Sequence, residues 1–379
     1  NGEIKNSNPN RFGGQAPLPA SVPNIAKTLK KKGYATGCFG KWGLGGQGTT
    51  GDPLSQGFDR FYGYNCQRNA HNLYPTYLED DDQVHELKGN ARKQTGEHYA
   101  PQLIADKMLD YVRAHKDEPF FLYYPTVLPH LPLQVPEKDL AQYKGKWPET
   151  PYKGGSYQPH DDPKACYAAM ISFIDGQVGR LTALLKELKI DDNTLILFTS
   201  DNGTSFLKSQ VDYTFFDSVG PLRGLKGQLH EGGIRVPMIV RWPGRITAGT
   251  SNDLIAAHYD LPATLAEIAG TKFDAQSDGI SILPSLLGQD DSQKKHDFLF
   301  WDFAGYGGQL AVRMGKWKGI KQNLKKNPNA ALKLYNLEED IGEQINVVEK
   351  HADIAQQMES IMLEQRTMPS IEKFRFGRY

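Results

Sequence analysis

The stretch that decides the fold is 166–203, CYAAMISFIDGQVGRLTALLKELKIDDNTLILFTSDNG. Its apolar residues recur at spacings of three and four, which predicts a helix over 166–188 with one buried face; they are Tyr167, Met170, Ile171, Ile174, Val178, Leu181, Leu185 and Leu188. A short loop, 189–193, follows, and the apolar run after it predicts a buried strand over 194–199. A helix that leads closely into a buried strand is typical of α/β folds.

The same alternation extends along the chain. Further helices are predicted at 22–32, 99–115 and 261–269, and further strands at 35–40 (ATGCFG), 120–125 (FFLYYP) and 236–242 (VPMIVRW). We therefore expect an α/β domain over residues 1–289, in which helices sandwich a mostly parallel sheet.

A polar stretch at 288–297, GQDDSQKKHD, reads as a linker. Beyond it lie strand-like pieces, FLFWDF (298–303) and LAVRMGKWKGI (310–320), and a predicted helix over 354–365. Residues 290–379 are therefore expected to form a smaller α+β subdomain with a small antiparallel sheet and a terminal helix.

Composition excludes several classes of partner. Lys and Arg total 44, as do Asp and Glu, so the balanced charge predicts no nucleic acid and no anionic membrane as partner. No apolar run approaches the roughly 20 residues that span a bilayer. The three cysteines, Cys38, Cys66 and Cys166, are far apart in sequence, which argues against a structural zinc site and a disulfide scaffold.

Polar side chains follow the predicted strands at or just beyond their ends, or stand in a loop before a strand. Ligands of open, mostly parallel sheets bind in the crevice outside the carboxyl ends of the strands, so these side chains are the candidates for a site. They are Lys41, His130, Asp201, Asn202 and Lys226.

Asp201 and Asn202 offer two hard oxygen ligands of the kind that Ca²⁺ or Mg²⁺ prefers, and Gly203 permits a sharp turn beside them. Calcium takes roughly six to eight oxygens, so two residues are too few. Either the acidic run EDDD at 79–82 folds into the site, or the remaining ligands come from residues outside this chain. By default that run reads as a solvated loop.

Each candidate also has a plainer interpretation. Asp-Asn-Gly is a common turn or helix cap, and a lysine beside a tryptophan is often a surface residue with its stem packed. His130, in PHLP, could lie on the rim of a loop. The coincidence of all these residues at strand ends of one α/β pattern favours a functional site.

Six stretches resemble a sulfatase of the arylsulfatase type, within the alkaline phosphatase-like superfamily, in the order that this family has. They are TLKKKGYATGCFGKWGLGG (28–46), QGFDRFYGY (56–64), PFFLYYPTVLPHLPLQVPEK (119–138), SFIDGQVGRLTALLKELKIDDNTLILFTSDNG (172–203), PLRGLKGQLHEGGIRVPMIVRWPGRI (221–246) and LYNLEEDIGEQINVV (334–348).

The resemblance implies a sulfuric ester hydrolase that acts on an aryl or carbohydrate sulfate. It implies that Asp201 and Asn202 bind Ca²⁺ or Mg²⁺, and that Lys41, His130 and Lys226 hold the sulfate and assist the leaving group. Lysines suit a compact anion, and a protonated His or Lys can protonate a leaving oxygen. It also implies export to a periplasmic or extracellular compartment.

Two departures from the family pattern stand out. Gly43 takes the place of a histidine in a motif that would read GKWHLG; His71 could reach in as a replacement at the substrate, or it could simply pack in its aromatic-rich loop. The family's nucleophile, a formylglycine made from the first residue of a C/S-x-P/A-x-R motif, has no counterpart at Cys38, Cys66 or Ser21. We therefore expect the nucleophile and the missing metal ligands on an N-terminal segment outside this chain, and the 379 residues alone to be inactive.

Two other functions stay open on these residues. A metal and a set of cations would bind phosphate as well as sulfate, which allows a phosphoric or phosphonic ester hydrolase. A chain that has lost its nucleophile could instead be a non-catalytic binder of sulfated glycans.

Overall fold

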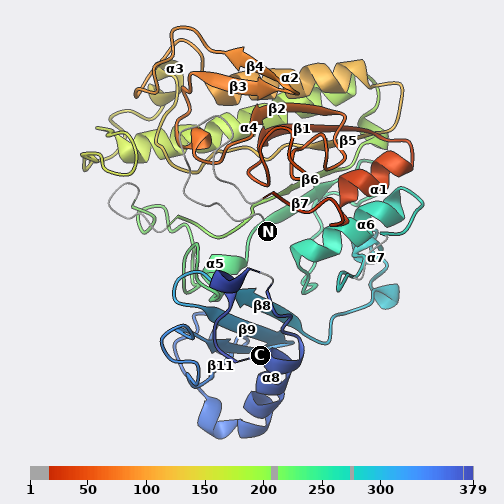
Figure 1. Ribbon diagram of the computed structural model, residues 1–379, viewed down its shortest axis with the longest axis vertical. Coiled ribbons are helices and arrows are strands. Elements are labelled where there is room, and N and C mark those ends of the chain that lie inside the picture. Colours follow the sequence, from red (N-terminus) through yellow and green to blue (C-terminus); the bar gives the residue numbers. More distant parts are fainter. Residues whose placement is uncertain (1–16, 206–211, 274–276, 370, 379) are drawn as a thin grey trace.

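The computed structural model describes residues 17–205, 212–273, 277–369 and 371–378. A larger part carries the elements up to α7, and a smaller part below it in Figure 1 carries β8 to β11 and α8. The predicted division into an α/β part and a C-terminal α+β part is observed; the boundary at 289/290 stays a prediction.

A five-stranded sheet forms the centre of the larger part, in the order β4-β3-β2-β1-β5. Strand β1 is flanked by β2 and β5, both parallel to it, whereas β3 and β4 continue the sheet antiparallel. The bounds are Ala35–Lys41 (β1), Arg60–Tyr64 (β2), Tyr77–Asp80 (β3), Gln83–Glu86 (β4) and Phe120–Tyr123 (β5).

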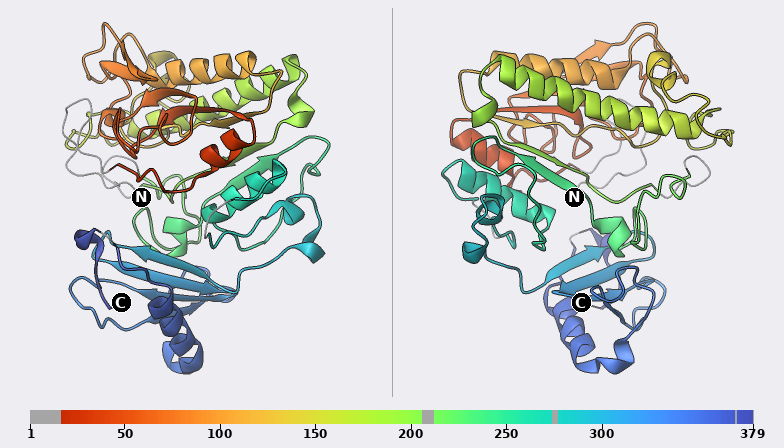
Figure 2. Two further views of the ribbon diagram at one scale, coloured as in Figure 1. Left: turned by 45° about the vertical axis from the view of Figure 1, so that its right-hand side comes forward. Right: turned by 180° about the vertical axis from the view of Figure 1, so that it is seen from behind.

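Helices cover both faces of this sheet, as predicted. On one face α2 (Ala100–Ala114) packs against β1, and α4 (Pro163–Glu187) packs against α2. On the other face α1 (Ile25–Lys31) contacts β1 and α6 (Leu261–Ile268) (Figures 1 and 2). The buried side chains of α4 include Cys166, Met170, Phe173, Leu184 and Leu185. Met170 and Leu185 belong to the predicted face, whereas Ile171, also predicted there, is 44% exposed.

Shorter elements complete the molecule. The helices α3 (Glu137–Leu140), α5 (Glu231–Ile234) and α7 (Leu283–Leu286) are single turns. The 3₁₀ turns are Asn69–His71, Asp191–Asn193, His258–Asp260, Asp290–Ser292, Val348–Lys350 and Glu372–Phe374. No helix in the described ranges is both long enough and apolar enough to cross a membrane.

Strands β6 (Ile196–Thr199) and β7 (Met238–Arg241) form a separate antiparallel pair on the β5 side of the sheet (Figure 1). The α/β class is confirmed, but the parallel pairing is limited to β2, β1 and β5. Large apolar side chains of this region are exposed: Tyr123 of β5 by 45% and Ile239 of β7 by 63%. Within the described residues β5 pairs only with β1 and β6 pairs only with β7, so each of these two strands has one unpaired edge.

The C-terminal subdomain is an antiparallel sheet in the order β11-β10-β9-β8 with one helix against it. The bounds are Leu299–Phe303 (β8), Gln309–Met314 (β9), Trp317–Lys321 (β10), Lys333–Asn336 (β11) and Ala352–Glu364 (α8). Met358 and Met362 of α8 join a core with Val312 and Leu334 of the sheet. The strand predicted at 298–303 and the terminal helix have counterparts in β8 and α8, whereas the piece predicted over 310–320 forms two strands, β9 and β10.

Candidate functional site

The carboxyl ends of β1 and β5 are held together where Lys41 ends β1. The amide of Lys41 donates to the carbonyl of Pro125 over 2.8 Å. Gly40 makes this approach possible, because a Cβ at its position would lie 2.3 Å from the same carbonyl oxygen. The segment that follows β5 thus starts beside Lys41 and continues to His130.

His130 lies face to face with His71, the residue proposed as a replacement for the family histidine. Their ring centroids are 5.7 Å apart and their planes differ by 10°. Tyr157 contacts both rings, with centroids 5.3 Å from His71 and 6.2 Å from His130. The Nδ1 of His130 lies 2.6 Å from the carbonyl of Leu131, which can only accept, so the Nδ1 carries the proton and the Nε2 is left for another partner.

Asp201 and Asn202 follow β6, and backbone contacts tie them to the loop that carries Lys226. The amide of Lys226 donates to the carbonyl of Thr204 over 2.9 Å, and the amide of Gly203 donates to Gly233 over 3.0 Å. Gly203 allows no side chain, since its Cβ would lie 1.9 Å from the carbonyl oxygen of Gly232. The candidates at β6 and before β7 are therefore held by one set of turns.

Electrostatics join these two groups into one cluster. Burial lowers the pKa of Lys41, the charge of Lys226 lowers it further, and Asp201 opposes both effects. Burial also lowers the pKa of Lys226, again opposed by Asp201. The two lysines and the carboxylate are therefore within electrostatic reach of one another.

The two histidines are part of the same cluster. The pKa of His71 is lowered to about 4, by burial first and then by the charges of Lys41 and Lys226. The pKa of His130 is also lowered to about 4, by burial and then by Lys226. Both rings are therefore neutral at neutral pH, and a bound anion would favour their protonation.

The oxygens at Asp201 and Asn202 fit one side of a shell for Ca²⁺ or Mg²⁺. The amide nitrogen of Asn202 donates to the carbonyl of Gly203 over 3.0 Å, which leaves its side-chain oxygen as the ligand atom. Across the described residues no three His, Cys, Asp or Glu side chains gather as a metal site. The assignment of Asp201 and Asn202 as metal ligands therefore stays a prediction.

The acidic run 79–82 has structural partners instead. Asp80 and Asp81 pair with Arg60 of β2, and Glu79 is buried and accepts from the amide of Asn65 over 3.1 Å. The default interpretation as a solvated loop is wrong for Glu79 and Asp80, which lie in β3. These carboxylates bind β2 and the segment after it.

Two neighbours of the site carry no clear signal in the sequence. Tyr157 lies in the long connection 129–163, which has no periodic pattern. His258 precedes α6, and its Nε2 lies 3.4 Å from the hydroxyl of Thr199 at the end of β6. Partial burial lowers the pKa of His258, and the charge of Asp201 opposes this. The position of Thr199 at a strand end is the signal that could have directed attention to His258.

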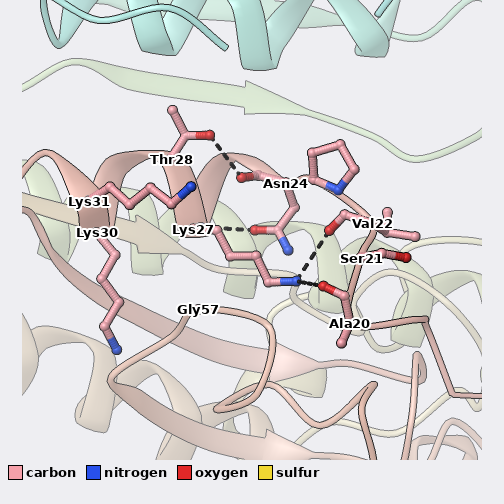
Figure 3. A pocket seen from close by; sticks show the side chains of 10 residues that line it. Ala20, Ser21, Val22, Asn24, Lys27, Thr28, Lys30, Lys31 and Gly57 are labelled. Atoms are coloured by element: carbon pink, nitrogen blue, oxygen red, sulfur yellow. Dashed lines mark hydrogen bonds between the residues drawn. The ribbon is translucent and has the colours of Figure 1, made fainter. Parts of the chain in front are cut away.

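A separate groove of about 550 Å³ lies beside α1 (Figure 3). Its lining includes Lys27, Lys30 and Lys31 and none of the clustered candidates. The ammonium of Lys27 donates to the carbonyls of Ala20 and Val22 over 3.0 and 3.2 Å. This cation therefore serves the local backbone.

The cluster unites two lysines, two neutral imidazoles and a carboxylate–amide pair beyond the ends of β1, β5 and β6. Lysines near a hard-cation site can bind a compact anion with several oxygens, and an imidazole can transfer a proton to or from it. The arrangement therefore suits hydrolysis of a sulfate or phosphate ester.

The chain matches two protein families. The model described as "Sulfatase" matches residues 3–271, and that described as "N-sulphoglucosamine sulphohydrolase, C-terminal" matches residues 225–368. Human N-acetylgalactosamine-6-sulfatase is 31% identical over 285 residues, which cover 71% of this chain and 49% of that protein. Human arylsulfatase A is 31% identical over 323 residues, which cover 79% and 58%. The chain thus spans about half of the length of these relatives.

Solved structures share the fold. Ps i-CgsB in complex with k-i-k-neocarrahexaose superposes with a TM-score of 0.74 at 27% identity, over 93% of this chain and 76% of that one. Phosphonate monoester hydrolase of Agrobacterium radiobacter has a TM-score of 0.62 at 19% identity, over 92% and 81%. The fold is therefore the alkaline phosphatase-like fold. Because the first family model covers most of its residues, the chain belongs to the sulfatase family.

Proposed function

We propose that the protein hydrolyses the sulfate ester of a carbohydrate or aryl substrate. The observation that carries this proposal is the gathering of Lys41, Lys226, His71 and His130 with Asp201 at the strand ends. Two lysines can bind the compact sulfate group, and the neighbouring carboxylate and amide can supply oxygen ligands to a metal ion that stabilises the same charge.

Lys41 and Lys226 hold the nonbridging oxygens of the sulfate. Both lysines are half-buried, which excludes part of the water that would weaken this attraction. His130 directs its Nε2 away from Leu131, and it protonates the leaving oxygen once the bound anion has raised its pKa. His71, stacked on His130, contacts the substrate from the position that replaces the family histidine.

Asp201 and Asn202 would hold Ca²⁺ or Mg²⁺, and the ion would supply positive charge next to the sulfate. The nucleophile would be a formylglycine, as the resemblance to the family implies. Cys38, Cys66 and Ser21 do not open a C/S-x-P/A-x-R motif; the stretch SNPNR at 7–11 has this form and lies outside the described residues. Asp201 and Asn202 supply fewer oxygens than Ca²⁺ takes, so we assign the remaining ligands to a segment outside the described residues. The exposed apolar side chains of β5 to β7 support this assignment, because such surface is normally covered.

A carbohydrate substrate is supported by the relatives, since N-acetylgalactosamine-6-sulfatase is named for a sulfated sugar and Ps i-CgsB was solved with a neocarrahexaose. Aromatic side chains such as Tyr157 beside the two histidines suit the faces of a sugar ring. Export from the cytoplasm agrees with such a substrate.

The proposal is tested by comparing rates on nitrophenyl sulfate and nitrophenyl phosphate with the full-length protein. We expect a higher kcat/KM for the sulfate. A preference for the phosphate would overturn the proposal in favour of a phosphoric or phosphonic ester hydrolase, the function of a structural neighbour. Binding of sulfated glycans without turnover of either ester would indicate a binding protein.

A further inference from the structure

Buried charges join the two parts of the molecule at α5, which lies between the larger part and the C-terminal sheet (Figures 1 and 2). Glu231 at the start of α5 is 2% exposed, and one of its carboxylate oxygens lies 2.6 Å from the ammonium of Lys318, which is fully buried in β10. The other oxygen lies 2.8 Å from the guanidinium of Arg313 in β9. Because a buried charge is stable only when it is paired, α5 and the C-terminal sheet depend on each other.

The turn that begins with Glu231 contacts the metal-ligand segment directly. Gly233 accepts the hydrogen bond from the amide of Gly203, immediately after Asp201 and Asn202. The carbonyl of Gly232 occupies the space where a side chain of residue 203 would be. A displacement of α5 would therefore displace the segment that carries Asp201 and Asn202.

The same subdomain holds the loop of Lys226 from both sides. On one side the buried amide of Gln309, in β9, donates to the carbonyl of Gly227 over 2.8 Å. On the other side the guanidinium of Arg223 donates to the backbone carbonyl of Glu343 over 2.6 Å. The carboxylate of Glu343 also accepts from the amide of Glu231 over 2.7 Å.

We propose that Glu231 and Lys318 are positioning residues, through which the C-terminal subdomain fixes both Lys226 and the pair Asp201–Asn202. The inference rests on the proposed function only for the identity of the bound anion and metal. The positioning itself does not depend on that function: the buried ion pair fixes α5, and α5 and the C-terminal sheet together fix segments 200–205 and 223–233.

The test compares Lys318→Met with Lys321→Met in the full-length protein. Both lysines lie in β10, but Lys321 pairs with Glu359 of α8 inside the subdomain and, among the described residues, forms no hydrogen bond or ion pair with α5. Backbone hydrogen exchange is measured for 200–205, 223–233 and α8, together with the affinity for inorganic sulfate.

We expect Lys318→Met to speed exchange in 200–205 and 223–233 and to weaken sulfate binding by about tenfold, while α8 stays protected. Lys321→Met should leave exchange in both segments and the sulfate affinity unchanged. The proposal would be overturned if Lys318→Met left hydrogen exchange in both segments unchanged. It would also be overturned if Lys321→Met sped exchange in both segments as much as Lys318→Met does.

Glu231→Gln provides a second test if Lys318→Met fails to fold, because glutamine keeps the shape and one acceptor. It should speed exchange in the same two segments; no change there would overturn the proposal. In the double variant the loss of sulfate affinity should be smaller than the sum of the losses in the two single variants, because each single substitution removes the same ion pair. If the wild-type protein binds no sulfate, the proposed function fails, while the exchange pattern still decides whether the positioning is real.

Discussion

Gly203→Ala introduces one methyl group at the contact between α5 and the segment that carries Asp201 and Asn202. The added Cβ would lie 1.9 Å from the carbonyl oxygen of Gly232 and 2.9 Å from the Cα of Gly233. The Gly232 turn cannot retreat easily, because its amide donates to Arg223 over 2.7 Å. Overpacking against a fixed backbone costs about 1–3 kcal/mol of stability. A shift of Asp201 and Asn202 by roughly 1 Å would lower turnover by about 100-fold.

Gly179→Ala is the matched control, because its Cβ would meet nothing within 4 Å on the surface of α4. Alanine is favoured over glycine in a helix, so this variant should gain about 0.5–1 kcal/mol of stability and keep wild-type turnover. The assays are urea unfolding, calcium titration by calorimetry and turnover of a sulfate ester with the full-length protein. If Gly203→Ala matched the control in stability and calcium affinity, the described packing of the ligand segment would be wrong.

Three further predictions follow from charge and exposure. Burial, opposed by Lys318, raises the pKa of Glu343 to about 7, so the folded state binds the extra proton between its ordinary pKa of 4.5 and 7, and stability falls as the pH rises through this window. The free energy of unfolding of Glu343→Gln should therefore rise relative to that of the wild type by up to about 3 kcal/mol as the pH is raised from 5 to 8. Urea unfolding measures this difference, and a difference that does not change with pH would refute the prediction. Sulfate should raise the lowered pKa values of His71 and His130, so sulfate binding takes up protons and its affinity increases from pH 7 to pH 5. Calorimetry in two buffers of different ionisation enthalpy measures the protons taken up, and a release of protons would contradict this prediction. The 379 residues expressed alone should be inactive and prone to aggregate through the exposed strands β5 to β7, and a soluble, active preparation would contradict this.

The sequence predicts the parts of the fold whose signal is local. The helix at 166–188 and the strands at 35–40 and 194–199 are visible because their apolar residues follow the period of the element, and each has its counterpart in α4, β1 and β6. Strands β2 to β4 escape prediction because they have only four or five residues each, and β4 is mostly polar. The antiparallel pairing of β6 with β7 depends on contacts between distant segments, which no local pattern encodes.

In the candidate site, too, the residues with a local sequence signal are the ones that the sequence identifies. Lys41, Asp201 and Lys226 are candidates on the sequence because they stand at or near the ends of recognisable strands, where an α/β sheet gathers its ligands. The stacking of His71 on His130 could only be a hypothesis, since it requires two loops to meet. The ion pair of Glu231 with Lys318 was not predictable, because it forms only when the C-terminal sheet docks on α5.

The most direct test of the account is the kcat/KM of the full-length protein on a sulfate ester, compared between wild type and Asp201→Asn. The substitution keeps the size of the side chain and removes the charge that a hard cation requires. We predict calcium-dependent turnover by the wild type and a loss of at least about 100-fold in the variant. Turnover of Asp201→Asn at the wild-type rate, or a wild-type protein inactive on every sulfate ester, would contradict the account.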